Sequence, residues 1–86
     1  MQYFLSKSFE KQFKKLPKKM KQQAVERLQL FLSDPMDYRL RNHSLTGVWA
    51  GHRSIDVTGD IRAIYNKADE NVARFVAIGS HSELYE

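Results

Sequence analysis

Histidine is the side chain of this sequence best suited to proton transfer, and three are present: His43, His52 and His81. Imidazole exchanges protons near neutral pH, so histidines suit general acid–base work on a hydroxyl group and a leaving oxygen. His43 and His81 are the candidates for such work, although an isolated loop histidine is more often an ordinary polar surface residue. His52, between Gly51 and Arg53, is interpreted as a strand-edge or loop residue.

Charged and aromatic side chains near these histidines supply further candidates. Arg62 can clamp a phosphate, because guanidinium binds phosphate oxygens in bidentate fashion. Its alternative role is a cross-strand ion pair with Asp56, which contributes little when exposed. Asp60 can orient a histidine or act as a base, and Tyr85 can stack on a base, donate a hydrogen bond or simply pack. Trp49 is interpreted as a core anchor rather than as an RNA platform.

Metal and thiol chemistry find little support in the sequence. There is no cysteine, which excludes disulfides, thiol catalysis and cysteine-based zinc sites. No HExxH motif or close histidine pair exists, and His43 and His81 lie far apart without a pattern of supporting ligands. We therefore expect neither a metal site nor a cofactor.

Positive charge is concentrated in the first third of the chain. Residues 1–27 contain eight basic and two acidic side chains, a net charge of +6, whereas the remaining residues sum to −2. Such a block suits a phosphate backbone, whose affinity comes largely from neutralised charges. A solvated, lysine-rich helix face is the alternative. The candidate RNA-binding residues are Lys14, Lys15, Lys18, Lys19, Arg53 and Asp56.

The elements that must position these residues follow the order β-α-α-β-β-β. Apolar residues at i, i+4 and i+7 from Phe9 to Leu16 predict an amphipathic helix that Ser6 or Ser8 caps and Pro17 ends. A second helix is expected over residues 18–32, and a loop over 36–52. Strands are expected over residues 1–5, 53–58, 61–66 and 72–78. We predict a single α+β domain over residues 1–86, with two antiparallel helices packed on a twisted antiparallel sheet.

The polarity of the strands fixes the register of the first hairpin. A three-residue loop over 58–60, with Gly59 in the left-handed conformation, pairs Val57 with Ile61 and Ile55 with Ala63. Paired residues share a face, so these four point to the helices. Asp56 and Arg62 then stand opposite each other on the other face.

The length and the apolar pattern limit the number of domains and indicate whether the protein is secreted or inserted in a membrane. Eighty-six residues is the size of one domain, and its core is thin. The first residues turn charged too early for a secretory signal, and no apolar run approaches the roughly 20 residues that span a bilayer. We expect a cytoplasmic protein that does not interact with membranes.

Four short motifs, in order, resemble the RelE/ParE toxin superfamily and its YafQ-like branch. They are HSLTG at 43–47, GHRSI at 51–55, GDIRAIY at 59–65 and GSHSELY at 79–85. The helical half fits as well, so the resemblance covers nearly the whole chain. Each motif is only moderately specific, but their order and spacing together are much stronger.

This resemblance implies a RelE-like fold and a toxin of a type II toxin–antitoxin system, held in check by a cognate antitoxin. Such a toxin cleaves mRNA without metal, usually in the ribosomal A site, so the partners would be mRNA and the ribosome. Transferred position by position, the active residues are His43, Asp60, His81 and Tyr85, with Arg62 placed to bind phosphate. We hypothesise that His81 is the general acid and that Asp60 or His43 is the base.

Two positions depart from the YafQ-like pattern. That branch commonly has a histidine where this chain has Asp56, which puts the identity of the base in doubt. It also tends to carry an arginine where this chain has Ala77, which removes a charge that could stabilise the transition state. We expect either that Arg62 and lysine side chains supply the missing positive charge, or that cleavage is slower.

Two alternatives remain open. A ParE-like toxin would inhibit DNA gyrase by binding it, without hydrolysis, but such toxins need no imidazole pair. A non-catalytic module that binds RNA or the ribosome through the basic helices would block translation without cutting. Resemblance in fold does not decide among these functions.

Overall fold

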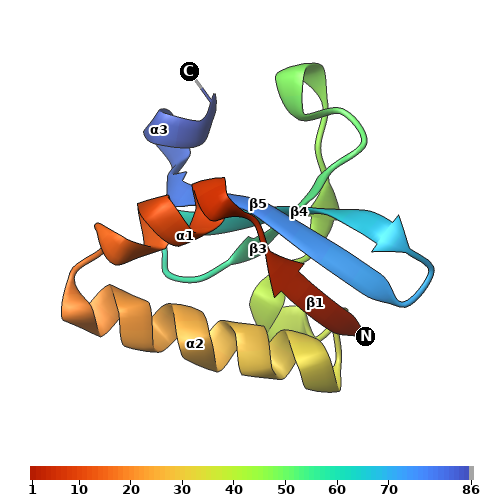
Figure 1. Cartoon of the computed structure of the whole chain (residues 1–86), viewed down its shortest axis with the longest axis horizontal. Coiled ribbons are helices and arrows are strands. Elements are labelled where there is room, and N and C mark those ends of the chain that lie inside the picture. Colours follow the sequence, from red (N-terminus) through yellow and green to blue (C-terminus); the bar gives the residue numbers. More distant parts are fainter. Residues whose placement is uncertain (86) are drawn as a thin grey trace.

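The chain forms the expected strands and helices and two short elements besides. The computed structural model describes residues 1–85 (Figure 1). The expected elements are β1 (Gln2–Leu5), α1 (Lys7–Lys14), α2 (Lys18–Ser33), β3 (Arg53–Asp56), β4 (Ile61–Asp69) and β5 (Val72–Ser80). The additional ones are the strand β2 (His43–Ser44) and the helix α3 (His81–Tyr85), with short 3₁₀ turns at Tyr38–Leu40 and Gly47–Trp49. The predicted α+β class is confirmed.

Local signals determine where the two long helices begin and end. The Ser6 hydroxyl accepts a hydrogen bond from the Phe9 amide at 3.1 Å, so Ser6, not Ser8, caps α1. Pro17 separates the helices and immediately precedes α2, where its fixed φ and missing N–H cost nothing. Four exposed lysines flank the turn between them: Lys14, Lys15, Lys18 and Lys19.

The sheet has the strand order β1-β5-β4-β3-β2. The expectation of a wholly antiparallel sheet is wrong at one edge, because β1 pairs with β5 in parallel, with Tyr3 opposite Ala73. No turn dictates the direction of β1, since its partner follows some 70 residues later. The parallel arrangement packs Tyr3 and Leu5 on the core, where the Tyr3 ring meets Phe75 edge-on with 5.6 Å between ring centroids.

The predicted register of the first hairpin is confirmed. Ile55 pairs with Ala63 and Asp56 with Arg62. The conformation expected for Gly59 is wrong, since the positive φ angles among residues 1–85 fall at Arg41, Gly47 and Gly51. A side chain closes this loop instead: the Thr58 hydroxyl accepts from the Asp60 amide at 3.2 Å and from the following amide at 2.9 Å.

Apolar residues cover both faces of the sheet. Helices α1 and α2 cover one face, where Phe9, Phe31 and Phe75 are completely buried. A smaller cluster on the other face contains Ile64, Ala77 and Leu84, with Leu45, Trp49, Val76 and Tyr85 partly buried around it. Figure 1 shows α2 below the sheet, and α3 and the loop between β2 and β3 above it. The second cluster therefore joins the two elements that carry His43 and His81.

Candidate active site

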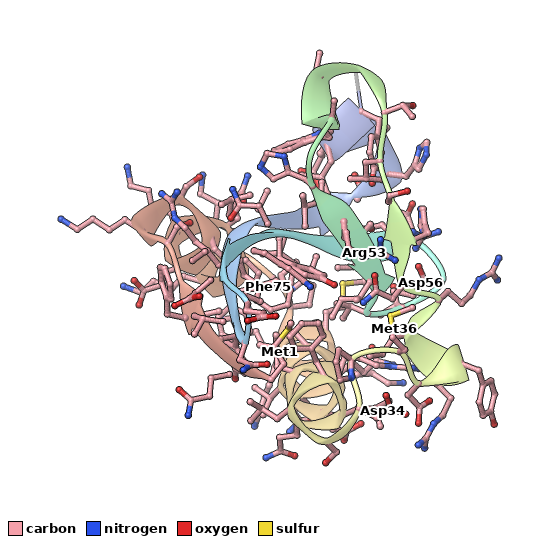
Figure 2. All side chains as sticks on the ribbon, turned by 90° about the vertical axis from the view of Figure 1, so that its right-hand side faces the viewer. Met1, Asp34, Met36, Arg53, Asp56 and Phe75 are labelled. Atoms are coloured by element: carbon pink, nitrogen blue, oxygen red, sulfur yellow. The ribbon has the colours of Figure 1, made fainter. Side chains whose placement is uncertain are left out.

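An open cleft of about 630 Å³ lies on the face of the sheet opposite α1 and α2. Five elements contribute to it: β2, β3, β4, α3 and the segment just before β2. Its lining residues are Arg41, Asn42, His43, Leu45, Asp56, Arg62, His81 and Tyr85. In Figure 2, Asp56 lies with Arg53 on the side of the molecule away from α1. The cleft gathers two imidazoles, two guanidiniums, one carboxylate and a phenol.

The ring of His43 is oriented by the backbone that precedes it. Its Nδ1 lies 2.8 Å from the carbonyl oxygen of Arg41. A carbonyl oxygen can only accept, so Nδ1 carries the hydrogen and donates it. In the neutral ring, Nε2 then keeps its lone pair and can accept a proton. The side chain is exposed at the edge of the sheet, where β2 pairs His43 with Ser54.

A capping box holds the start of α3 and therefore His81, its first residue. The Glu83 carboxylate accepts from the Ser80 amide at 2.8 Å, and the Ser80 hydroxyl accepts from the Glu83 amide at 3.2 Å. The bond from the Ser80 amide is the main reason that the pKa of Glu83 lies below its usual value. A third contact joins α3 to the hairpin, since the His81 amide donates to the Asp60 carbonyl at 3.2 Å.

The far end of α3 is attached to the loop between β2 and β3. The indole N–H of Trp49 donates to the Leu84 carbonyl at 2.8 Å. The ring of Tyr85 lies against that of His81, with 4.5 Å between centroids. Trp49 also meets His52 edge-on, at 5.2 Å. The interpretation of Trp49 as an anchor is confirmed, with the addition that it anchors the helix that presents His81 and Tyr85.

Asp56 lies between the two arginines of the cleft. Its Oδ1 is 3.2 Å from Nε of Arg62, and its Oδ2 is 3.7 Å from Nε of Arg41. Arg62 is further held by its Nη1, which donates to the carbonyls of Thr58 and Gly59 at 3.1 and 3.0 Å. The predicted pair of Asp56 and Arg62 is thus present, and Arg41 is an unexpected third member.

Other residues suggested by the sequence lie outside the cleft. The Asp60 carboxylate does not line it, although the Asp60 carbonyl binds the His81 amide. Arg53 is also absent from the lining. It donates from Nε to Asn42 at 2.8 Å, and Asn42 in turn donates to the Tyr65 hydroxyl at the same distance. Arg53 therefore supports the residue that precedes His43.

The lysines of the basic block do not line this cleft. Four lysines around the turn between α1 and α2 are exposed: Lys14, Lys15, Lys18 and Lys19. No three His, Asp or Glu side chains among residues 1–85 are gathered as metal ligands would be. Within the same range, no helix is long and apolar enough to cross a membrane.

Sequence reasoning missed three residues of the cleft: Arg41, Asn42 and Leu45. Leu45 was visible as an apolar residue of the loop and within the HSLTG motif. Arg41 and Asn42 stood beside His43, but nothing in the sequence indicated the left-handed turn at Arg41, with φ of 49°. That turn lies at the start of the segment of residues 41–43, which lines the cleft.

Comparison with solved structures supports the fold. The crystal structure of YafQ from E. coli strain BL21(DE3) has a TM-score of 0.81 and 24% identity, covering 98% of this chain and 97% of that one. A chain of the E. coli DinJ–YafQ toxin–antitoxin complex gives 0.76 and 26%, covering 98% and 96%. A chain of the RelBE2 toxin–antitoxin complex of Mycobacterium tuberculosis gives 0.69 and 20%, covering 93% and 96%. The RelE-like fold is therefore shared.

Sequence comparison identifies the family. No curated protein sequence matches the chain. A family model does match, over residues 1–86, and it describes a bacterial toxin of type II toxin–antitoxin systems, YafQ. The match covers all three helices, the sheet and every residue that lines the cleft. The chain therefore belongs to the YafQ family of type II toxin–antitoxin toxins.

Proposed function

We propose that this toxin is an endoribonuclease that cleaves mRNA in the ribosomal A site. The observation that carries the proposal is that His43, Arg62 and His81, from three different elements, line one cleft. Two imidazoles can move protons at the two oxygens of a phosphodiester, and a guanidinium can neutralise phosphate charge. Membership of the YafQ family supports the same activity, since the RelE-like toxins that the sequence resembles cleave mRNA.

RNA supplies its own nucleophile, so side chains alone can perform this reaction. The 2′-hydroxyl loses its proton to Nε2 of His43, and its oxygen forms a bond to phosphorus. The bond from phosphorus to the 5′-oxygen breaks, and protonated His81 gives its proton to that oxygen. The products are a 2′,3′-cyclic phosphate and a 5′-hydroxyl end. Neither step needs a metal ion or a cofactor, because both protons pass through imidazoles.

Geometry favours His43 over Asp60 as the base. The tautomer of His43 leaves Nε2 free to accept, and its ring lines the cleft, whereas the Asp60 carboxylate does not. Asp60 contributes through its main chain, by holding the His81 amide at 3.2 Å. The phenol of Tyr85, packed on the His81 ring, is placed to hold that ring or to contact the base next to the cleaved bond.

The lysines at the turn between α1 and α2 provide a second contact with nucleic acid. Lys14, Lys15, Lys18 and Lys19 are all exposed and lie within one short segment. A phosphate backbone, whether of mRNA or of ribosomal RNA, is attracted to such a cluster. Binding through them would weaken as the salt concentration rises, because exposed charges are screened.

A cognate antitoxin is the expected protein partner. YafQ of E. coli occurs in a toxin–antitoxin complex with DinJ, and RelBE2 of Mycobacterium tuberculosis is likewise a toxin–antitoxin complex. Growth arrest by this chain should therefore be relieved when its antitoxin is produced in the same cell.

Primer extension on mRNA from a translation reaction tests the proposed activity. Wild type, His81→Ala and His52→Ala are compared, with and without ribosomes. His52 is the matched control, because it is the one histidine outside the cleft. New 5′ ends within codons that require ribosomes, persist in His52→Ala and vanish in His81→Ala are expected.

Three other outcomes would change the assignment. Ends without ribosomes would indicate a free endoribonuclease. Full cleavage by His81→Ala would remove His81 from the mechanism. Growth arrest without any new ends would refute the nuclease, and a supercoiling assay on purified gyrase would then separate a gyrase inhibitor from a translation blocker.

A further inference from the structure

The two arginines of the cleft differ in how fully their guanidiniums are engaged. Arg62 uses Nε for Asp56 and Nη1 for the carbonyls of Thr58 and Gly59. Only its Nη2 remains without a partner among residues 1–85. A bidentate grip on phosphate needs two parallel N–H groups. Arg62 can therefore offer a phosphate only the N–H groups of Nη2, not a parallel pair from two nitrogens, without giving up its present partners.

Arg41 has both of its terminal guanidinium nitrogens, Nη1 and Nη2, available to bind a ligand. Among residues 1–85, the one interaction of its side chain is the ion pair from Nε to Asp56 at 3.7 Å, and this side chain is 79% exposed, against 20% for Arg62. Within the described residues, neither Nη1 nor Nη2 of Arg41 donates a hydrogen bond. The pair of nitrogens suited to bidentate phosphate binding thus belongs to Arg41.

The backbone of Arg41 points to a functional reason for this residue. It is the one non-glycine residue among residues 1–85 with a positive φ, 49°. A left-handed arginine costs about 1 kcal/mol relative to glycine or asparagine, which adopt this conformation readily. Such strain is concentrated at functional sites. Stability alone would favour another residue at this position.

The two arginines and Asp56 together carry an unbalanced positive charge. Two guanidiniums carry two positive charges and Asp56 carries one negative charge, so the group of three has a net charge of +1. A phosphodiester brings one negative charge and completes the balance. Because Arg41 and Arg62 approach opposite oxygens of Asp56, the carboxylate keeps both guanidiniums beside the cleft before RNA arrives.

We propose that Arg41 is a second phosphate-binding residue of this toxin, which grips the RNA phosphate in the cleft with both Nη atoms while Asp56 holds its Nε. The inference rests on the proposed nuclease activity and adds a residue to it. Arg62 supplies the fixed charge beneath the phosphate, and Arg41 closes over it from the exposed side.

Single-turnover cleavage of mRNA on programmed ribosomes, over a range of toxin concentrations, tests this role. The variant is Arg41→Asn, which removes the charge but keeps a residue that accepts the left-handed turn. The matched control is Arg39→Asn. Arg39 lies outside the cleft and is engaged by Asp37 at 2.9 Å, a bond that lowers the pKa of Asp37 to about 2. Both variants remove one arginine from the same segment.

The expected result is a loss of about tenfold in the ratio of maximal rate to half-saturating concentration for Arg41→Asn, the effect of one charge-assisted contact. Arg41→Lys should fall between it and wild type, because lysine keeps the charge but not the fork. Arg39→Asn should stay within twofold. The pH dependence of the rate should keep its shape in Arg41→Asn, since the carbonyl that holds His43 is retained.

Three results would overturn the inference, and they are distinguishable. If wild type cleaves but Arg41→Asn behaves like Arg39→Asn, Arg41 binds no phosphate while the proposed function stands. If wild type produces no cleavage at all, the nuclease proposal falls and takes this one with it. A change in the shape of the pH profile would assign the loss to a displaced His43 and contradict the phosphate contact.

Discussion

Replacing Trp49 with phenylalanine should loosen α3 while leaving the rest of the fold in place. The indole N–H is the donor to the Leu84 carbonyl at 2.8 Å, and it is the side-chain bond that attaches the end of α3 to the loop between β2 and β3. Phenylalanine keeps an aromatic ring in the small cluster of Ile64, Ala77 and Leu84 but cannot donate. The variant therefore removes the hydrogen bond and part of the packing, and leaves the other contacts in place.

The loss of free energy that holds α3 in place is the sum of these two contributions. Loss of one hydrogen bond that leaves a carbonyl without its partner costs about 1 kcal/mol. The smaller ring buries less apolar surface at a half-buried position, which adds roughly another 1 kcal/mol. A total of about 2 kcal/mol raises the ratio of detached to attached α3 up to about 30-fold. Because α3 presents His81 and Tyr85, the rate of the proposed cleavage should fall whenever the detached state becomes well populated.

Two measurements separate this account from a purely structural one. Urea unfolding followed by circular dichroism gives the change in stability, and amide hydrogen exchange at Leu84 and Tyr85 reports the attachment of α3. Val48→Ala, in the same loop at a side chain that is 86% exposed, is the control and should change neither. Unaltered exchange in α3 of the Trp49→Phe protein would refute the attachment, even if its overall stability were lower.

Two further predictions concern residues beside the cleft. Ser54 is completely buried and its hydroxyl has no hydrogen-bond partner among the described residues, so Ser54→Ala should raise the free energy of unfolding by about 1 kcal/mol in urea titrations; a clear loss would mean that the hydroxyl is bonded. The pKa of Glu83 is lowered below its usual 4.5 by the Ser80 amide, so its capping contribution is present above that value and disappears as the pH falls through the lower folded value. The protection factor of the Ser80 amide, which is its exchange rate relative to that of an unstructured amide at the same pH, should therefore fall in acid in wild type but not in Glu83→Gln, which caps without titrating; equal acid sensitivity of the two would contradict this.

The parts of the fold that depend on neighbours in sequence could be predicted. The register that sets Asp56 opposite Arg62 follows from apolar alternation around a short loop, so both residues were assigned to the correct face. The caps and the proline limits of the two helices are likewise local. Gly59 was misassigned because a glycine in a turn suggests a left-handed angle, whereas the Thr58 hydroxyl closes this loop without one.

The parts that depend on distant contacts could not be predicted. The parallel direction of β1 is determined by packing of Tyr3 and Leu5 on the core, not by any turn. The attachment of Trp49 to Leu84 joins residues 35 positions apart. The Ser80-x-x-Glu83 capping box was readable in the sequence, and it could have indicated α3.

The same division applies to the candidate site. His43, Arg62, His81 and Tyr85 were assigned from residue type and resemblance, and the structure brings all four to one cleft. Arg41 was missed because its place there depends on a backbone conformation that arginine seldom adopts. Residue chemistry and motif order thus predict several residues of the cleft. The neighbouring residue Arg41, which lies there through an unusual backbone angle, could not be predicted in this way.

The pairing of β1 with β5 has a consequence for the order in which this protein is made. Strand β1, at one edge of the sheet, is synthesised before its partner β5, which follows about 70 residues later. Residues 2–5 must therefore wait, unpaired, until residues 72–75 have left the ribosome. Helix α3 and His81 follow later still. A nascent chain can form its helices early, but it lacks a complete cleft until α3 has been made, so the proposed activity would appear only near the end of synthesis.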